Sequence, residues 1–116
     1  MPLIRKSVVM QLKAGKEEEY RASHNEGFWI EMAAALKAHG AHNYHIALHP
    51  GTRQLFAYVE IEDEARWAAI ASSDVCKRWW AWMTEFIEFK KDGTPDAVEL
   101  KEMFFFDPVH PQGRSE

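Results

Sequence analysis

A chain of 116 residues with 47% hydrophobic residues is long enough for one folded domain and too apolar for a disordered segment. Its net charge of -4 argues against nucleic-acid binding, because phosphate recognition requires a concentrated basic surface. Cys76 is the single cysteine, which excludes an internal disulfide, and no apolar stretch is long enough to span a bilayer. We therefore expect a cytoplasmic protein with neither a membrane nor a nucleic acid as its partner.

The first third of the chain predicts a strand and two helical stretches. Residues 3–12 combine β-branched and apolar side chains, which is typical of a strand. Residues 16–24 are charged and helical, and residues 25–27 break or kink this region. Four apolar side chains spaced i, i+3, i+4, i+7 then indicate an amphipathic helix, which Gly40 ends. They are Trp29, Met32, Ala33 and Leu36.

The remaining chain predicts a hairpin, a second helical region and a last strand. Residues 41–48 and 54–61 are apolar runs separated by a Pro-Gly turn signal, which indicates a hairpin. Residues 63–87 are helical, with a restart at residues 72–74, where Ser-Ser-Asp supplies N-cap side chains. Residues 98–106 alternate apolar and other side chains and predict the last strand.

The order β-α-β-β-α-β predicts an α+β fold of the ferredoxin-like type, with a four-stranded antiparallel sheet and both helical regions on one face. We assign residues 1–106 to a single domain and residues 107–116 to a C-terminal tail. Both faces of this sheet carry large apolar side chains, and the helices can cover only one. A second copy is the simplest cover, which predicts a homodimer; a monomer whose helical insertions reach round the sheet is the alternative.

The six histidines do not indicate a metal site. In a strand, His42 and His45 are expected to point to opposite faces, whereas a catalytic zinc requires three convergent ligands. The sequence has no HExxH or CxxC spacing and no glycine-rich phosphate loop. We therefore expect no bound metal.

A few residues suit a pocket wall. His24 lies four residues after Tyr20 on one helix face, where the helix breaks, although spacing alone favours a solvated surface histidine. Trp79 belongs to a helical apolar stripe and by itself indicates a core residue. Trp80 is rotated by about 100° from it and faces a pocket, the sheet edge or a partner chain. Tyr44 lies in the second predicted strand and can donate a hydrogen bond.

Four stretches together resemble the L-rhamnose mutarotase family, over nearly the whole chain from Ile4 to about Phe106. They are residues 19–25, 38–44, 56–61 and 73–80. The linked sequences HGAHNY and DVC-x-RWW form the most specific part of this signature. The resemblance implies an α+β barrel built from two chains, no metal or organic cofactor, and exchange between the two anomers of free L-rhamnose.

The resemblance also implies roles for single residues. It makes His24 the catalytic proton donor. It implies sugar contacts for four aromatic residues, which are Tyr20, Tyr44, Trp79 and Trp80. The chain departs from the family beside His24, because Ala22 and Ser23 stand where the family often has arginines. Residues 26–30 are one residue longer and lack the prolines often found there.

Two other functions fit the same scaffold. They are a cofactor-free oxygenase and a non-enzymatic small-molecule binding module, since the ferredoxin-like fold hosts many activities. Anomer exchange requires protonation of the sugar ring oxygen and removal of the proton from the anomeric hydroxyl. Histidine suits such transfers because its ordinary pKa is about 6.5. The sequence does not identify the base that would act beside His24.

Overall fold

The computed structural model describes residues 2–25 and 27–109; residues 110–116, the larger part of the predicted tail, lie outside them. The four strands are β1 (Ile4–Gln11), β2 (Ala41–His49), β3 (Gln54–Ile61) and β4 (Val98–Leu100). The helical elements are α1 (Glu17–Ser23), α2 (Phe28–Ala38), α3 (Glu64–Ala68), the 3-10 helix η1 (Ala69–Ser72) and α4 (Asp74–Met83).

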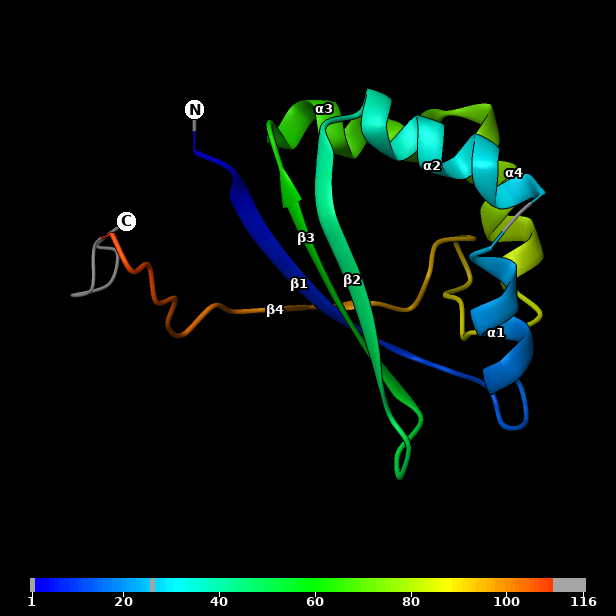
Figure 1. The fold of residues 1–116 in the computed structure, drawn as a ribbon. Coiled ribbons are helices and arrows are strands. Elements are labelled where there is room, and N and C mark those ends of the chain that lie inside the picture. Colours follow the sequence, from blue (N-terminus) through cyan, green and yellow to red (C-terminus); the bar gives the residue numbers. More distant parts are fainter. Residues whose placement is uncertain (1, 26, 110–116) are drawn as a thin grey trace.

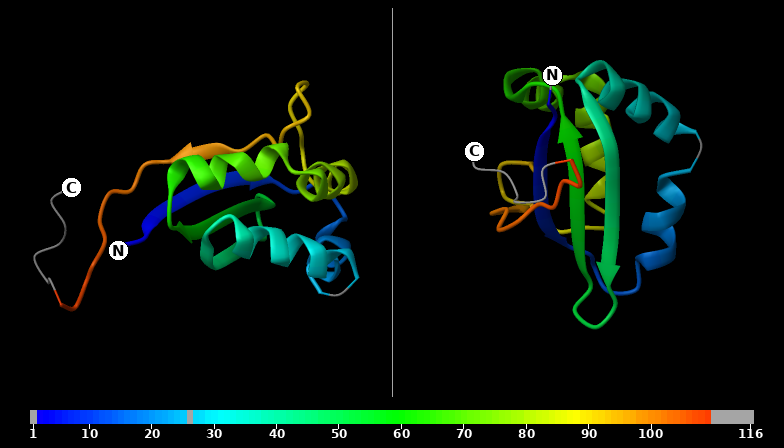
Figure 2. Two further views of the ribbon diagram at one scale, coloured as in Figure 1. Left: turned by 90° about the horizontal axis from the view of Figure 1, so that it is seen from above. Right: turned by 60° about the vertical axis from the view of Figure 1, so that its left-hand side comes forward.

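The four strands form one antiparallel sheet in the order β2-β3-β1-β4. This order confirms the predicted ferredoxin-like arrangement. Figure 1 shows the helices gathered on one side of the sheet, and the right-hand view of Figure 2 shows the segment after β4 on the side opposite α4. Alternate residues of β3 are buried toward the helices, as the pleat of a strand requires. They are Leu55, Ala57, Val59 and Ile61.

Local chemistry explains where the helices begin. Gly27 has a φ of 71°, a conformation that suits glycine, and separates α1 from α2 at the predicted break. Asp63 and Ser73 cap α3 and α4, because their side chains accept from the backbone amides of Arg66 at 2.8 Å and Cys76 at 3.2 Å. The predicted restart at residues 72–74 is therefore confirmed.

The core lies between the sheet and the helices. It joins Leu12, which follows β1, and Leu55 of β3 to residues of every helical element except α3 and to two residues that follow α4. Its buried members are Leu12, Tyr20, Met32, Leu55, Ile70, Cys76, Trp79, Met83, Phe86 and Ile87. Over the described ranges, none of the helices has the length and apolarity needed to cross a membrane.

The last strand is shorter than predicted. β4 covers only Val98–Leu100 and pairs with Ser7–Val9 of β1, so the prediction of a strand over residues 98–106 was wrong. Alternating apolar side chains indicate which residues favour burial. They do not show whether the backbone forms hydrogen bonds with a neighbouring strand. Here Met103 and Phe104 are 86% and 70% exposed, so the alternation belongs to a segment that this chain alone leaves uncovered.

Candidate active site

A cavity of about 850 Å³ lies between the helices and the face of the sheet that they cover. Its volume is within the range of small-molecule sites, roughly 300–1,000 Å³. α1, α2, α4 and β2 all contribute to its walls. All five side chains that the sequence analysis assigned to a site line this one cavity. They are Tyr20, His24, Tyr44, Trp79 and Trp80.

His24 is held by one of its two ring nitrogens. It follows the last residue of α1, and its Nδ1 lies 3.0 Å from the Tyr20 carbonyl oxygen and 3.1 Å from Ser23 Oγ. Among residues 2–25 and 27–109, none forms a hydrogen bond with Nε2. Burial lowers the pKa of His24 below its ordinary value, and the hydrogen bond with the Tyr20 carbonyl only partly opposes this effect. His24 is therefore neutral at pH 7, with Nε2 available to a ligand.

Three aromatic rings surround the His24 imidazole. Its ring centroid lies 4.8 Å from that of Tyr20, 5.2 Å from that of Trp29 and 5.3 Å from that of Trp79. Trp79 is only 6% exposed, so the predicted core residue is also a wall of the cavity. Close packing of this kind restricts the imidazole to one orientation and removes water from its faces.

Trp29 is a functional candidate that the sequence analysis missed. Its spacing with Met32 indicated a core helix, and that interpretation holds because Trp29 packs against the core. The break at Gly27 turns α2 relative to α1, which brings Trp29 beside His24 as well. Local spacing gives no signal for a contact across such a break.

Two titratable side chains of the cavity, those of Tyr20 and Cys76, keep their protons at neutral pH. Burial raises the pKa of Tyr20 well above its ordinary value, so its hydroxyl remains a hydrogen-bond donor. Burial also raises the pKa of the Cys76 thiol to about 11, so this buried thiol stays protonated and packs as an apolar group. Tyr44 keeps 43% of its surface exposed, and its ring centroid lies 6.4 Å from that of Trp67.

A β-bulge immediately precedes Tyr44. His42 pairs with Glu60 and His45 with Tyr58, so three steps of β2 face two steps of β3. The extra residue carries both histidines to the same face of the sheet. The prediction that His42 and His45 point to opposite faces was therefore wrong, because strict alternation fails where a strand contains an additional residue.

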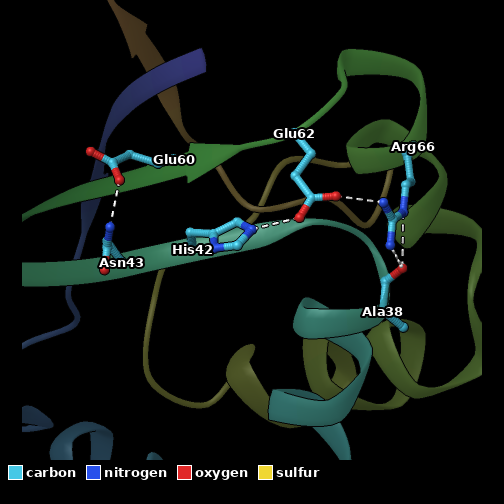
Figure 3. Close-up of polar contacts among 6 residues, drawn as sticks. All are labelled: Ala38, His42, Asn43, Glu60, Glu62 and Arg66. Atoms are coloured by element: carbon cyan, nitrogen blue, oxygen red, sulfur yellow. Dashed lines mark hydrogen bonds and ion pairs between the residues drawn. The ribbon is translucent and has the colours of Figure 1, made fainter. Parts of the chain in front are cut away.

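Asn43 forms this bulge in a left-handed conformation. Its φ is 50°, which asparagine tolerates better than most residues because its short side chain can form a local hydrogen bond. The Asn43 side-chain amide donates to the Glu60 carboxylate (Figure 3). That carboxylate also accepts from the Tyr58 hydroxyl at 2.7 Å. These hydrogen bonds on the outer face of the sheet stabilise the bulged backbone, from which the Tyr44 side chain extends to the cavity.

A second polar network ties the ends of α2, β2 and β3 together. The Glu62 carboxylate lies 2.6 Å from His42 Nε2 and 2.7 Å from Arg66 Nη1, and Arg66 also donates to the Ala38 carbonyl at the end of α2 (Figure 3). His42 Nε2 is thus paired with the Glu62 carboxylate in an interaction between two side chains. The described part of the chain contains no group of three or more His, Cys, Asp or Glu residues arranged to hold a metal.

The fold and the cavity define a small α+β protein with a half-buried, neutral histidine in an aromatic site, an arrangement suited to proton transfer on a bound organic molecule. A family model for L-rhamnose mutarotase matches residues 5–106. An L-rhamnose mutarotase of Opitutus terrae is 53% identical over 105 residues, which cover 90% of this chain and 100% of that relative. The chain therefore belongs to the L-rhamnose mutarotase family.

Solved structures agree with this assignment. The crystal structure of an L-rhamnose mutarotase from Formosa agariphila matches with a TM-score of 0.79 and 26% identity, over 90% of this chain and 99% of that one. An antibiotic biosynthesis monooxygenase-type protein of Bordetella bronchiseptica matches with a TM-score of 0.63 at 13% identity, over 89% and 99% of the two chains. The second likeness is one of fold alone.

Proposed function

We propose that the protein is an isomerase of carbohydrate metabolism that interconverts the α and β anomers of L-rhamnopyranose. One observation carries this proposal. The cavity of a chain in this family contains the half-buried imidazole of His24, fixed by aromatic packing, whose Nε2 forms no hydrogen bond with the described residues. Such a group can transfer a proton at the anomeric centre, and the whole reaction requires only proton transfers and one bond rotation.

The proposed roles follow from what each side chain offers. His24 supplies the proton that the ring oxygen gains when the bond between it and the anomeric carbon breaks. Tyr20 and Tyr44 are protonated phenols that can donate to sugar hydroxyls. Trp79 and Trp80 present apolar surface on which the methyl group and the C–H face of a deoxysugar can be buried. This division between apolar walls and a few polar groups is typical of small-molecule sites.

Magnetisation transfer between the two anomers of L-rhamnose, with and without protein, tests the proposal. We expect the protein to accelerate exchange in proportion to its concentration. A stable complex without faster exchange would instead indicate a binding module. Oxygen uptake with an aromatic substrate, and no effect on rhamnose, would indicate the oxygenase.

Substitution of Asn43 tests whether the bulge places Tyr44. Asn43→Ala puts an ordinary side chain at a φ of 50°, which costs roughly 1–2 kcal/mol, and also removes the bond to Glu60. We expect this variant to raise KM for L-rhamnose by about tenfold. Asn43→Gly tolerates the same φ and should recover most of the loss, which steady-state exchange measurements can detect. Equal KM values in both variants and the wild type would show that the bulge does not position Tyr44.

We propose that the chain forms a homodimer through the sheet face opposite the helices. Six large apolar side chains on this face and on the segment after β4 are at least 39% exposed. They are Phe56, Val98, Leu100, Met103, Phe104 and Phe106. Arg5 holds this segment in place, because it donates to Glu102 at 2.6 and 2.9 Å and lies 3.7 Å from the Phe105 ring centroid. An ordered apolar surface of this kind indicates a protein interface.

A charge placed on this surface should dissociate the dimer. We expect Phe104→Asp to weaken association by about 30-fold or more, since loss of a buried aromatic anchor costs roughly 2 kcal/mol or more. Light scattering over a concentration series measures the effect. Ile30→Asp is the matched control, because Ile30 is 65% exposed but lies on α2, and it should leave the mass unchanged. A monomeric wild type at micromolar concentration would contradict the dimer.

A further inference from the structure

Ser23 is a buried polar residue in direct contact with His24. It ends α1, is only 4% exposed, and its Oγ donates to the Tyr20 carbonyl at 2.6 Å. The same Oγ lies 3.1 Å from His24 Nδ1, which itself lies 3.0 Å from the Tyr20 carbonyl oxygen. The hydroxyl, the carbonyl and the ring nitrogen therefore form a closed triangle of hydrogen-bonding atoms.

This triangle determines which nitrogen of His24 carries the proton. A serine hydroxyl has one hydrogen, and here the carbonyl receives it, so Ser23 presents a lone pair to Nδ1. The carbonyl oxygen presents a lone pair to Nδ1 as well. An unprotonated Nδ1 would face two acceptors and no donor, which is unfavourable at a buried site. Nδ1 therefore carries the hydrogen, and the neutral ring has its lone pair on Nε2.

We infer that Ser23 is a positioning residue that holds His24 as the Nδ1–H tautomer, so that His24 acts first as the base and then as the acid of the same turnover. This inference rests on the proposed function and deepens it. It also accounts for the base that sequence reasoning left unidentified, because one imidazole serves both steps.

The proton balance of this cycle closes without a second protein group. Nε2 accepts the proton of the anomeric hydroxyl, and the electron pair of that O–H bond forms the carbonyl of the open-chain aldehyde. The bond between the anomeric carbon and the ring oxygen breaks, and its electron pair stays on the ring oxygen, which takes the proton from Nε2. Both oxygens are bonded to the same carbon, so one nitrogen can reach each in turn. After rotation of the aldehyde, the reverse steps give the other anomer and neutral His24.

The direction of the His24 pKa shift agrees with this order of events. Burial lowers the pKa, so the neutral form that the cycle requires predominates at physiological pH. The rate should therefore be constant above the pKa of His24 and should fall as the pH drops through it. An imidazolium that starts the reaction would give the opposite profile, with the rate falling as the pH rises.

Long-range proton–nitrogen NMR on protein labelled with ¹⁵N-histidine reports the tautomer directly. In the unliganded wild type we expect a protonated Nδ1 and an unprotonated Nε2 for His24. Ser23→Ala removes one of the two acceptors at Nδ1, so we expect a mixture of tautomers and an exchange rate about 5- to 10-fold lower, the value of one lost hydrogen bond. Ser23→Thr keeps the hydroxyl and should restore both the tautomer and the rate if the variant folds.

Ser73→Ala is the matched control. Ser73 Oγ also donates to a carbonyl three residues earlier, that of Ile70 at 2.6 Å, but no histidine among the described residues forms a hydrogen bond with it. This variant should lose stability while the His24 tautomer and the pH profile stay unchanged. A protonated Nε2 in the wild type, an unchanged tautomer in Ser23→Ala, or a rate that falls as the pH rises would each overturn the inference. Absence of any accelerated exchange in the wild type would instead overturn the proposed function, since the NMR readout does not depend on activity.

Discussion

Substitution of His24 by alanine should slow the exchange of rhamnose anomers by about 10²-fold or more, the usual contribution of one positioned proton-transfer group. The fold should persist, because His24 follows the end of α1 and is outside the buried core cluster. His24→Gln can still form hydrogen bonds at this position but cannot release its proton near neutral pH. It should therefore bind L-rhamnose and exchange it as slowly as the alanine variant does.

His39 provides the matched control for this experiment. Its Nδ1 also lies near the carbonyl of the residue four positions earlier, that of Ala35 at 2.8 Å, and it likewise follows the end of a helix. It is not among the residues that line the cavity. His39→Ala should cost at most about 1 kcal/mol of stability and leave the exchange rate unchanged. A folded His24→Ala protein that exchanges anomers at the wild-type rate would show that the proton transfer occurs elsewhere.

Adjacent tryptophans in α4 should respond very differently to truncation. Trp79 is 6% exposed, and Trp79→Ala should lower the free energy of unfolding by about 3–5 kcal/mol, a large part of the stability of a small domain. Its ring centroid lies within 5.7 Å of those of four other residues. They are His24, Phe28, Trp29 and Trp82.

Trp80 is half-buried and lines the cavity, so its loss should affect the ligand more than the fold. We expect Trp80→Ala to weaken L-rhamnose binding by about tenfold, which corresponds to roughly 1.4 kcal/mol of lost apolar contact. Calorimetric titration and thermal unfolding of both variants separate the two effects. If Trp80→Ala unfolds at a much lower temperature while the affinity per folded molecule is unchanged, Trp80 is a packing residue.

The sequence by itself determined the order and type of the elements, because apolar periodicity and turn chemistry are local properties. The hairpin of β2 and β3 and the capped start of α4 at Ser73 lie where these patterns predicted them. For the site, spacing alone favoured a surface position for His24 and a core position for Trp79. Only the resemblance to a family placed both of them in one site, and both line the cavity.

Tertiary structure decided the features that depend on partners distant in the chain. Trp29 and Trp79 meet His24 only because the fold brings α2 and α4, which pack against each other, to the end of α1. The bulge at Asn43 exists because Glu60 and Tyr58 of β3 stabilise a conformation that β2 alone would not favour. The short β4 reflects the same principle. The pattern of residues along the chain indicates which side chains favour burial. The tertiary fold determines which strands and aromatic rings from distant parts of the chain contact them.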